Sequence, residues 1–472
     1  MGAIYSREQE RYIQVLAGTI LKPFQKFFRT EASGGILLMA AAAAAMAAAN
    51  SPFGDAYRHL WEITAGVSIA SFRLEQTLHH WINDGLMSVF FFLVGLEIKR
   101  EVLVGELRSV SRASLPLAAA LGGMVVPAAL YLLLNFGGEG ARGWGVPMST
   151  DIAFALGALA LLGRSVPPAL LVFLTALAIV DDLGAILVIA LFYTEQLSVG
   201  ALAAALFILA LSYIINRMGV RRTLPYVLLG FALWLMLLKS GIHATVAGVL
   251  LAMTIPATVT IRHNEFVNVM ERQLGYLTGN DRGVNVCPVE LDHDGRQALF
   301  RSLEEACHRA QPPLERIEQS LHPWVVYVIM PLFAFANAGV AVDTGALWTA
   351  FTDPVFLGVT AGLVIGKQAG VFAFSYGAVR LGLATLPTGV DWRHIYGVGL
   401  LSGIGFTMSL FVGNLAFTDP ELLATVKLAV IISSIAAGTA GFGFLWFVTG
   451  RKGRGRREEE RRGGRGQADP LG

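Results

Sequence analysis

The chain has 472 residues, of which 54% are hydrophobic and only 15% are charged, and its formal net charge at pH 7 is +2. Soluble domains carry about 25% charged residues, so this composition and a mean hydropathy of +0.59 exclude a soluble globular protein. Many apolar stretches reach the roughly 20 residues that a helix needs to cross about 30 Å of hydrocarbon. The sequence therefore predicts an all-α polytopic membrane protein.

The two ends of the chain are expected at the cytoplasmic surface of the membrane. Residues 1–32 contain "YIQVLAGTILKPFQKFF", whose mixture of apolar and basic residues predicts an amphipathic arm. The first residues, "MGAIYSREQERY", are polar, so no cleavable signal peptide is predicted. Residues 450–472 are basic and rich in Gly, which predicts a disordered tail. We expect membrane lipid as the partner of this tail, and no nucleic acid.

Apolar stretches along the chain predict about twelve transmembrane helices. The first eight form a unit over 33–257, and the last four form a unit over 322–449. Basic loops alternate with loops that carry few basic residues, and the positive-inside rule then places both termini in the cytoplasm. The predicted spans are 33–50, 79–98, 113–134, 145–163, 167–192, 198–216, 223–238, 240–257, 322–341, 355–377, 394–416 and 422–447.

Residues 51–78 are predicted to lie outside the cell, between the first two spans. Val67, Ile69, Phe72 and Leu74 are spaced there as on one face of a β-strand, so a short external hairpin is one interpretation. An irregular loop is the alternative, and the pattern favours neither.

The polar segment 258–321 is the one long predicted excursion, and we place it in the cytoplasm. Apolar residues recur at helical spacing in "EFVNVMERQLGYL" and "GRQALFRSLEEACHRA", which predicts two short amphipathic helices. Cys287 and Cys307 fall in this segment, so no disulfide is predicted. Their spacing to His293 and His308 is poor for zinc.

Charged side chains interrupt three of the apolar spans. Asp181 and Asp182 lie in "LTALAIVDDLGAILVIALFY", Asp151 follows "PMST", and Lys367 lies in "LVIGKQAG". A charge at the bilayer centre costs at least about 2.5 kcal/mol, so such residues indicate function. Neighbouring helical residues point about 100° apart, so the adjacent carboxylates cannot face one point. We expect Asp181 to pair with Lys367, and Asp182 and Asp151 to face a shared cavity.

A carboxylate cluster of this kind predicts competition between protons and a small cation. Hard cations prefer oxygen ligands, which Asp182, Asp151 and the Thr150 hydroxyl can supply. Burial and neighbouring negative charge both favour proton uptake by the same oxygens. For Asp151 alone, a purely structural hydrogen bond is the alternative.

Breaks in two apolar segments support a site inside the membrane. "PMSTD" and "LLSGIGFTMSLF" each interrupt a helix with Pro, Gly, Ser or Thr. Irregular backbone at membrane depth is tolerated where it lines a cavity, so two interrupted helices meeting at the midplane are predicted. Asp151 and Lys367 are expected to offset the partial charges of the helix ends. His243 and His322 lie near span ends, as pH-sensing or structural residues.

Several long stretches resemble the bacterial NhaA family of Na+/H+ antiporters: "STDIAFALGALALLG", "LTALAIVDDLGAILVIALFYT", "LKSGIHATVAGVL", "HPWVVYVIMPLFAFANAGV", "LVIGKQAG" and "SGIGFTMSLF". The resemblance implies an inverted-repeat transporter fold in the bacterial inner membrane, with two interrupted helices crossing at the midplane. It implies electrogenic, pH-regulated exchange of cytoplasmic Na+ or Li+ for external H+ by alternating access. No cofactor is implied, and a homodimer through 51–78 is expected.

The resemblance also assigns roles to residues. Asp181 and Asp182 resemble the pair that binds Na+, Li+ or protons, with Asp151 and Thr150 beside it and Lys367 as the charge partner. Residues that resemble the family's pH-responsive cluster are Glu97, Arg100, Glu101, Glu318 and His322, and His243 is a further candidate. Gln319 and Gln368 stand where family members often carry histidine and proline, which puts the pH set-point in doubt.

Three other functions are compatible with membrane aspartates. An intramembrane aspartyl protease would need a GxGD context that "STDIAF" and "IVDDLG" lack. A polyprenyl transferase would need a DDxxD-type Mg2+ site, whereas this chain has "DDLGA". A passive cation channel would not require a buried lysine opposite the two aspartates. We therefore predict a coupled transporter and not an enzyme.

Overall fold

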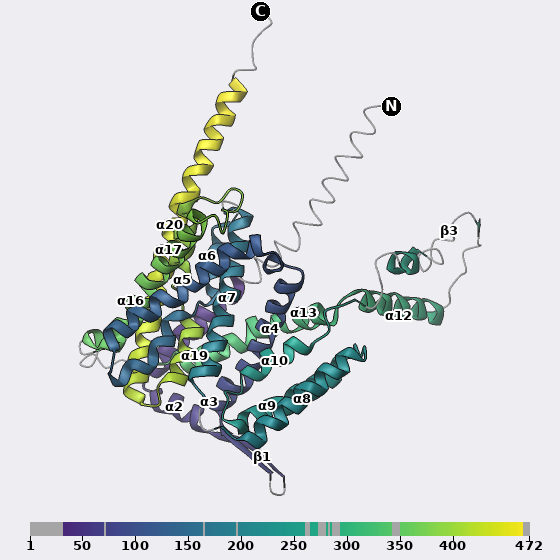
Figure 1. The fold of residues 1–472 in the computed structure, drawn as a ribbon, viewed down its shortest axis with the longest axis horizontal. Helices are drawn as coiled ribbons and strands as arrows, with labels where there is room; N and C mark the ends of the chain where they lie inside the picture. Colours follow the sequence, from purple (N-terminus) through teal and green to yellow (C-terminus); the bar gives the residue numbers. More distant parts are fainter. Residues whose placement is uncertain are drawn as a thin grey trace, which may run out of the picture.

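The structure is a computed structural model, and it describes residues 32–69, 72–163, 166–194, 197–259, 265–271, 280–281, 284–285, 293–341 and 350–465. These residues form a bundle of long helices with two small two-stranded sheets (Figure 1). The predicted all-α polytopic fold is confirmed. The predicted arm over 1–32 lies outside the described residues, apart from its last residue.

Within the described residues, nine helices are long and apolar enough to cross a membrane alone. Two further pairs of shorter helices pass the same test together, each bent at a short break. The nine spans are Ala32–Ala49, Leu78–Leu103, Val110–Asn135, Pro168–Phe192, Val199–Arg217, Thr223–Ser240, Pro313–Asn337, Pro354–Arg380 and Pro420–Thr449.

The two bent pairs are the two segments that the sequence predicted to be interrupted. In the first, η3 (Glu139–Met148) and α6 (Ile152–Leu161) meet at 41°, and in the second, α18 (Trp392–Ser402) and α19 (Phe406–Ala416) meet at 45°. The breaks touch, because the backbone N–H of Asp151 donates to the carbonyl of Ile404 over 2.7 Å. Unpaired helix ends from both pairs are thereby gathered at one place inside the bundle.

The predicted span 240–257 is much shorter than expected. α9 (Thr223–Ser240) is followed by Gly241, whose φ of 83° is in the left-handed region that favours glycine. α10 (Val246–Thr254) then has only nine residues, about 14 Å of helix. Eleven spans at most are present in the described part of the chain, so a twelfth stays a prediction.

The predicted hairpin is present in the segment 51–78. β1 (Thr64–Ile69) pairs antiparallel with β2 (Phe72–Thr77), with Thr64 opposite Thr77 and Ile69 opposite Phe72. The alternative of an irregular loop is wrong. A helix that the sequence analysis did not predict, α2 (Gly54–Glu62), precedes the hairpin.

The predicted end of the long polar segment 258–321 is different in the structure. Residues 265–271 and α12 (His293–Ala310) are helical, as expected for the segment 258–321. Its last residues instead belong to a span, because α13 (Pro313–Trp324) continues through η5 (Val325–Ile329) into α14 (Met330–Asn337). Leu314 and Ile317 explain the early start, since both are buried in a cluster with Leu96 and Tyr226.

The basic tail over 450–472 was predicted to be disordered, and this stays a prediction; the structure describes residues 450–465 as helix. α20 (Pro420–Arg465) continues as one helix beyond the bundle (Figure 1). Extending an existing helix avoids the cost of nucleation, and Arg and Glu are good helix formers.

Glycines set the distance between α5 (Val110–Asn135) and α17 (Lys367–Arg380), which pack closely together. A Cβ on Gly370 would overlap the carbonyl oxygen of Gly122, and a Cβ on Gly122 would overlap that of Gly370. Small residues of this kind let helix backbones approach directly. The contact fixes the first turn of α17, where Lys367 begins the helix after the π-helical turn η6 (Gly362–Gly366).

Gly370→Ala is expected to lower the melting temperature of the purified protein, because the new methyl group meets backbone that cannot turn away. Overpacking costs about 1–3 kcal/mol. The matched control is Gly377→Ala on the same helix, where nothing lies within 4 Å of the added Cβ. Equal melting temperatures for the two variants would contradict the proposed close contact.

Candidate functional site

The buried ion pair between Lys367 and Asp181 is the centre of the candidate site. Asp181 lies in α7 (Pro168–Phe192), and its Oδ2 is 2.7 Å from Lys367 Nζ. Both side chains are fully buried. The ammonium group also donates to the carbonyl of Met148, which the break after η3 leaves free. The contact predicted between Asp181 and Lys367 is therefore present.

Thr150 completes the surroundings of this pair. Its hydroxyl lies 2.7 Å from Asp181 Oδ2 and 2.9 Å from the carbonyl oxygen of Ser402. The sequence analysis grouped Thr150 with Asp182 and Asp151, but the structure places its hydroxyl on Asp181. Thr150 thus connects the first break, the second break and α7.

Asp151 uses both carboxylate oxygens to cap helices. Oδ1 accepts from the N–H of Phe154 at 3.0 Å and caps α6. Oδ2 accepts from the N–H of Thr407 at 3.1 Å and from its hydroxyl at 2.6 Å, in the first turn of α19. A carboxylate between two helix N-termini offsets their positive partial charges, as predicted. This arrangement fits the structural alternative for Asp151, and a cavity shared with Asp182 stays a prediction.

Asp182 is in the opposite situation. It is fully buried, yet neither of its oxygens has a hydrogen-bond partner in the part of the chain that the structure describes. Oδ1 of Asp181 and the hydroxyl of Ser149 are buried without partners in the same described residues. Buried polar atoms normally have partners, so these oxygens are candidates for binding a proton or a small cation.

The sequence analysis missed two groups that hold the site together. Thr407 binds Asp151, and the Met148 carbonyl binds Lys367. The signal that could have identified Thr407 is its place two residues after the second glycine of "SGIGFT", where a second helix starts inside the membrane. No sequence signal identifies a backbone carbonyl.

Most of the expected pH-responsive residues are gathered where α4 (Met87–Leu103) meets α13. Arg100 contacts Glu318 through a short hydrogen bond, and its guanidinium is 3.4 Å from Glu101. Glu97 and His322 interact electrostatically with Arg100 and Glu318, respectively. We refer to these five residues as the charged cluster.

His243 was expected among the pH-responsive residues, but it does not contact the charged cluster in the described structure. Its Nε2 lies 3.5 Å from Asp84 Oδ1, and its Nδ1 lies 2.8 Å from the Thr245 hydroxyl. Asp84 precedes α4, whereas Arg100 is in its last turn. The prediction for His243 was based on its position near the end of a span, and this position does not determine which charged groups the side chain contacts.

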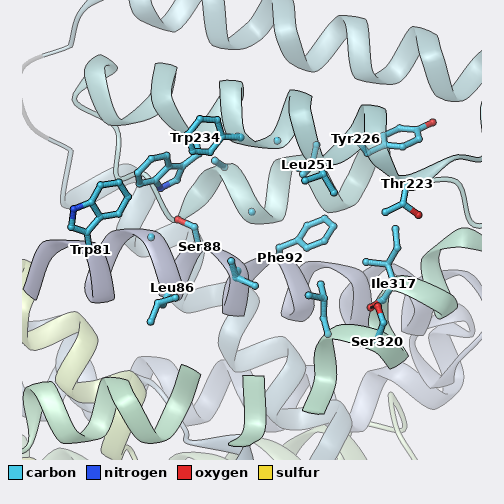
Figure 2. A pocket seen from close by; sticks show the side chains of 18 of the residues that line it. Trp81, Leu86, Ser88, Phe92, Thr223, Tyr226, Trp234, Leu251, Ile317 and Ser320 are labelled. Carbon is cyan, nitrogen blue, oxygen red and sulfur yellow. Dashed lines mark hydrogen bonds between the residues drawn. The ribbon is translucent and has the colours of Figure 1, made fainter. Parts of the chain in front are cut away.

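A cavity of about 820 Å³ lies between α4, α9, α10 and α13. Figure 2 shows Trp81 and Trp234 at one end, Thr223 and Ser320 at the other, and Phe92 between them. None of the aspartates of the candidate site lines it. Hard cations prefer oxygen ligands, so this mainly apolar space is not the candidate ion site.

Comparisons with known proteins agree with the geometry. The model of the family described as Na+/H+ antiporter 1 matches residues 25–445. The chain belongs to this family. It is 50% identical to "Na(+)/H(+) antiporter NhaA 2" of Syntrophotalea carbinolica, over 91% of this chain and 98% of that protein.

Other NhaA proteins are similarly close. The identity is 46% with the "Na(+)/H(+) antiporter NhaA" of Syntrophobacter fumaroxidans, over 93% of each chain. It is 48% with that of Oleidesulfovibrio alaskensis, over 90% of this chain and 93% of that protein. The resemblance to NhaA is confirmed, and because the family consists of transporters, the protease and transferase alternatives are excluded.

Lys367→Met is expected to destabilise the protein, because Asp181 would lose its buried charge partner. Removing one member of a buried ion pair costs about 3–5 kcal/mol, so the melting temperature in detergent should fall by several degrees. The double variant Lys367→Met/Asp181→Asn, which carries no unpaired charge at these two positions, should regain most of the loss. A single variant as stable as the native protein would contradict the energetic importance of the pair.

Proposed function

We propose that this protein exchanges cytoplasmic Na+ or Li+ for external protons, with Asp182 and Asp181 as the binding groups. The observation that carries the proposal is the buried Asp182 carboxylate, which has no partner among the described residues. An anion in that position requires a proton or a cation. Membership of the NhaA family supports Na+ and H+ as the two ions.

The geometry supports mutually exclusive binding of a cation and of protons at the aspartates. A cation that reaches Asp182 meets two buried oxygens that have no hydrogen-bond partner among the described residues. Protonation of the same oxygens removes the negative charge that the cation needs, so the two occupants exclude one another. The exchange is electrogenic if Asp182 and Asp181 each carry a proton in one state, with the Asp181–Lys367 pair broken, and one cation replaces both protons.

Alternating access requires that the site opens to one side at a time. The two helix breaks meet at the site, and the ends of four half-helices surround it. Small movements of one bent pair against α7 would therefore change the exposure of Asp182. A passive channel would need no such ion pair, so the exchange mechanism is the better explanation of Lys367.

We further propose that the charged cluster regulates exchange by pH. Three carboxylates, one guanidinium and one imidazole are held together by α4 and α13. Proton uptake there changes the charge balance around Arg100 and thereby the packing of the two helices. His243, with Asp84, is a separate candidate for pH regulation.

The proposed setting is the inner membrane of a bacterium, with both termini in the cytoplasm. The hairpin of β1 and β2 has the unpaired edges of a two-stranded sheet. Such edges pair readily with another strand, which supports a homodimer through residues 51–78. Membrane lipid is the remaining expected partner.

Asp182→Asn should abolish Na+- and Li+-driven exchange, because an amide holds neither the charge nor the exchangeable proton. The measurement is recovery of a pH-sensitive dye in everted vesicles after cation addition, across a pH series. The matched control is Asp353→Asn at the N-cap of α16 (Pro354–Ala361), where Asn caps as well as Asp. Unchanged exchange in the Asp182 variant, at equal amounts in the membrane, would reject the site.

Glu318→Gln should shift the pH profile of exchange while leaving its maximal rate within about twofold. The negative charge of Glu318 raises the pH at which the neighbouring titratable groups of the charged cluster lose their protons. Removing this charge should therefore move the midpoint of the pH profile of exchange to lower pH, by about 0.5–1 unit. Glu305→Gln makes the same charge change on α12, where Glu305 pairs with Arg309 in solvent. Identical profiles for both variants would exclude Glu318 from regulation.

A further inference from the structure

A network of amides joins three membrane spans at the end of the bundle opposite the charged cluster. Its centre is Asn337, the fully buried last residue of α14. The amide nitrogen donates to Asn83 Oδ1 at 2.9 Å and to the Phe333 carbonyl at 3.0 Å. The amide oxygen accepts from Asn414 Nδ2 at 2.7 Å and lies 3.1 Å from His79 Nε2. All four hydrogen-bonding positions of the amide are thus used.

The network crosses a boundary between two sets of helices. The helices α4, α8 (Val199–Arg217), α9, α10 and α13 pack mostly with one another, and η1 (Trp81–Leu86) and α14 adjoin them. α5, α7, α17, α18, α19 and α20 form the other set. Asn83 and Asn337 belong to the first set, whereas Asn414 lies on α19 in the second. The bond between Asn337 and Asn414 therefore ties the two sets together.

One face of α19 connects this bond to the candidate site. Thr407, Phe411 and Asn414 are spaced four and three residues apart, so they lie on the same face of the helix. Thr407 binds Asp151 at the site. The ring of Phe411 lies 5.3 Å from that of Phe91 and 6.3 Å from that of Phe333, across the boundary. Asn414 follows about 10 Å beyond Thr407 along the helix.

The bond is suited to breaking and re-forming. It joins two neutral amides, so its rupture leaves no unpaired charge behind, unlike the ion pair at the site. Oδ1 of Asn414 is buried without a partner among the described residues. In the described structure, the hydrogen bond from Asn414 Nδ2 to Asn337 Oδ1 therefore holds this amide in place, and breaking it releases α19 from the first set at this end.

We propose that Asn337 is a positioning residue of the exchange reaction, whose bond to Asn414 holds α19 against α14 and closes the site on the external side. The inference rests on the proposed function and on the proposed orientation. It predicts that the bond is intact when the site faces the cytoplasm and broken when the site faces outward. Phe411, packed against Phe91 and Phe333, forms the apolar part of the same closure.

A cysteine on α14, one helical turn before the residue that forms the Asn337–Asn414 hydrogen bond, tests the inference. The reporter is Phe333→Cys, four residues before Asn337, in protein whose two native cysteines, Cys287 and Cys307, are replaced by serine. Its reaction with a membrane-impermeant maleimide is timed in right-side-out vesicles. Adding Asn414→Ala should raise the labelling rate about fivefold, as expected for loss of one hydrogen bond.

The matched control is Asn216→Ala, which removes an amide bond of 2.7 Å to the Thr254 carbonyl between α8 (Val199–Arg217) and α10, within the first set. This control should leave the labelling rate unchanged. If Phe333→Cys is not recovered in the membrane, Phe91→Cys serves as the reporter, since it faces the same ring of Phe411.

The inference is overturned if Asn414→Ala leaves the labelling rate unchanged, or if Asn216→Ala raises it equally. The labelling rate measures whether α19 is closed against α14, and it does not depend on transport. The result is therefore independent of the test of Asp182. Faster labelling together with full exchange in Asp182→Asn would reject the proposed ion site and keep the closure. Unchanged labelling together with lost exchange in Asp182→Asn would keep the ion site and reject the closure.

Discussion

The positive charge of Lys367 lies fully inside the protein, and the surrounding structure is arranged to neutralise it. A bare ammonium in this position would cost several kcal/mol. Asp181 supplies the opposite charge, and the broken helix at Met148 supplies a free carbonyl. The glycine contact between α5 and α17 is needed because it sets where α17 starts and therefore where the ammonium lies. The irregular backbone, the close helix packing and the ion pair thus act together to stabilise the buried ammonium group.

Three buried aspartates in this region are satisfied in three different ways. Asp151 is satisfied by N–H groups of two helix ends and Asp181 by a lysine, whereas Asp182 lacks a partner in the described structure. The first two contacts stabilise the resting protein, so occupation by an ion would have to displace them. Asp182 can take an ion without such a loss. The three aspartates thus differ in their hydrogen bonds, and this difference is the reason that we propose Asp182 as the ion-binding carboxylate.

The sequence was sufficient to predict features that depend on local helix geometry or on a residue type that is rare within the predicted spans. Adjacent carboxylates on a helix must point apart, and Lys367 is the one base in the middle of a predicted span, so the pairing with Asp181 could be predicted. The breaks in both bent helices followed from Pro, Gly, Ser and Thr. Features that depend on how distant elements meet could not be predicted. The dual capping by Asp151 needs the start of α19, and His243 meets Asp84 because α10 starts late, after Gly241.

The two ends of the bundle are held by different chemistry, and this difference has a mechanical consequence. At one end, Arg100 and its carboxylates join α4 and α13, which belong to the same set of helices. In the proposed regulation, changing their charge alters packing within that set. At the other end, neutral amides join one set to the other across α19. Charged contacts respond to pH but cost much free energy to separate when buried, whereas amide contacts are insensitive to pH and separate easily. The proposed opening of the Asn337–Asn414 bond in each transport cycle is therefore better served by neutral amides, and the proposed response of the charged cluster to pH is better served by titratable groups.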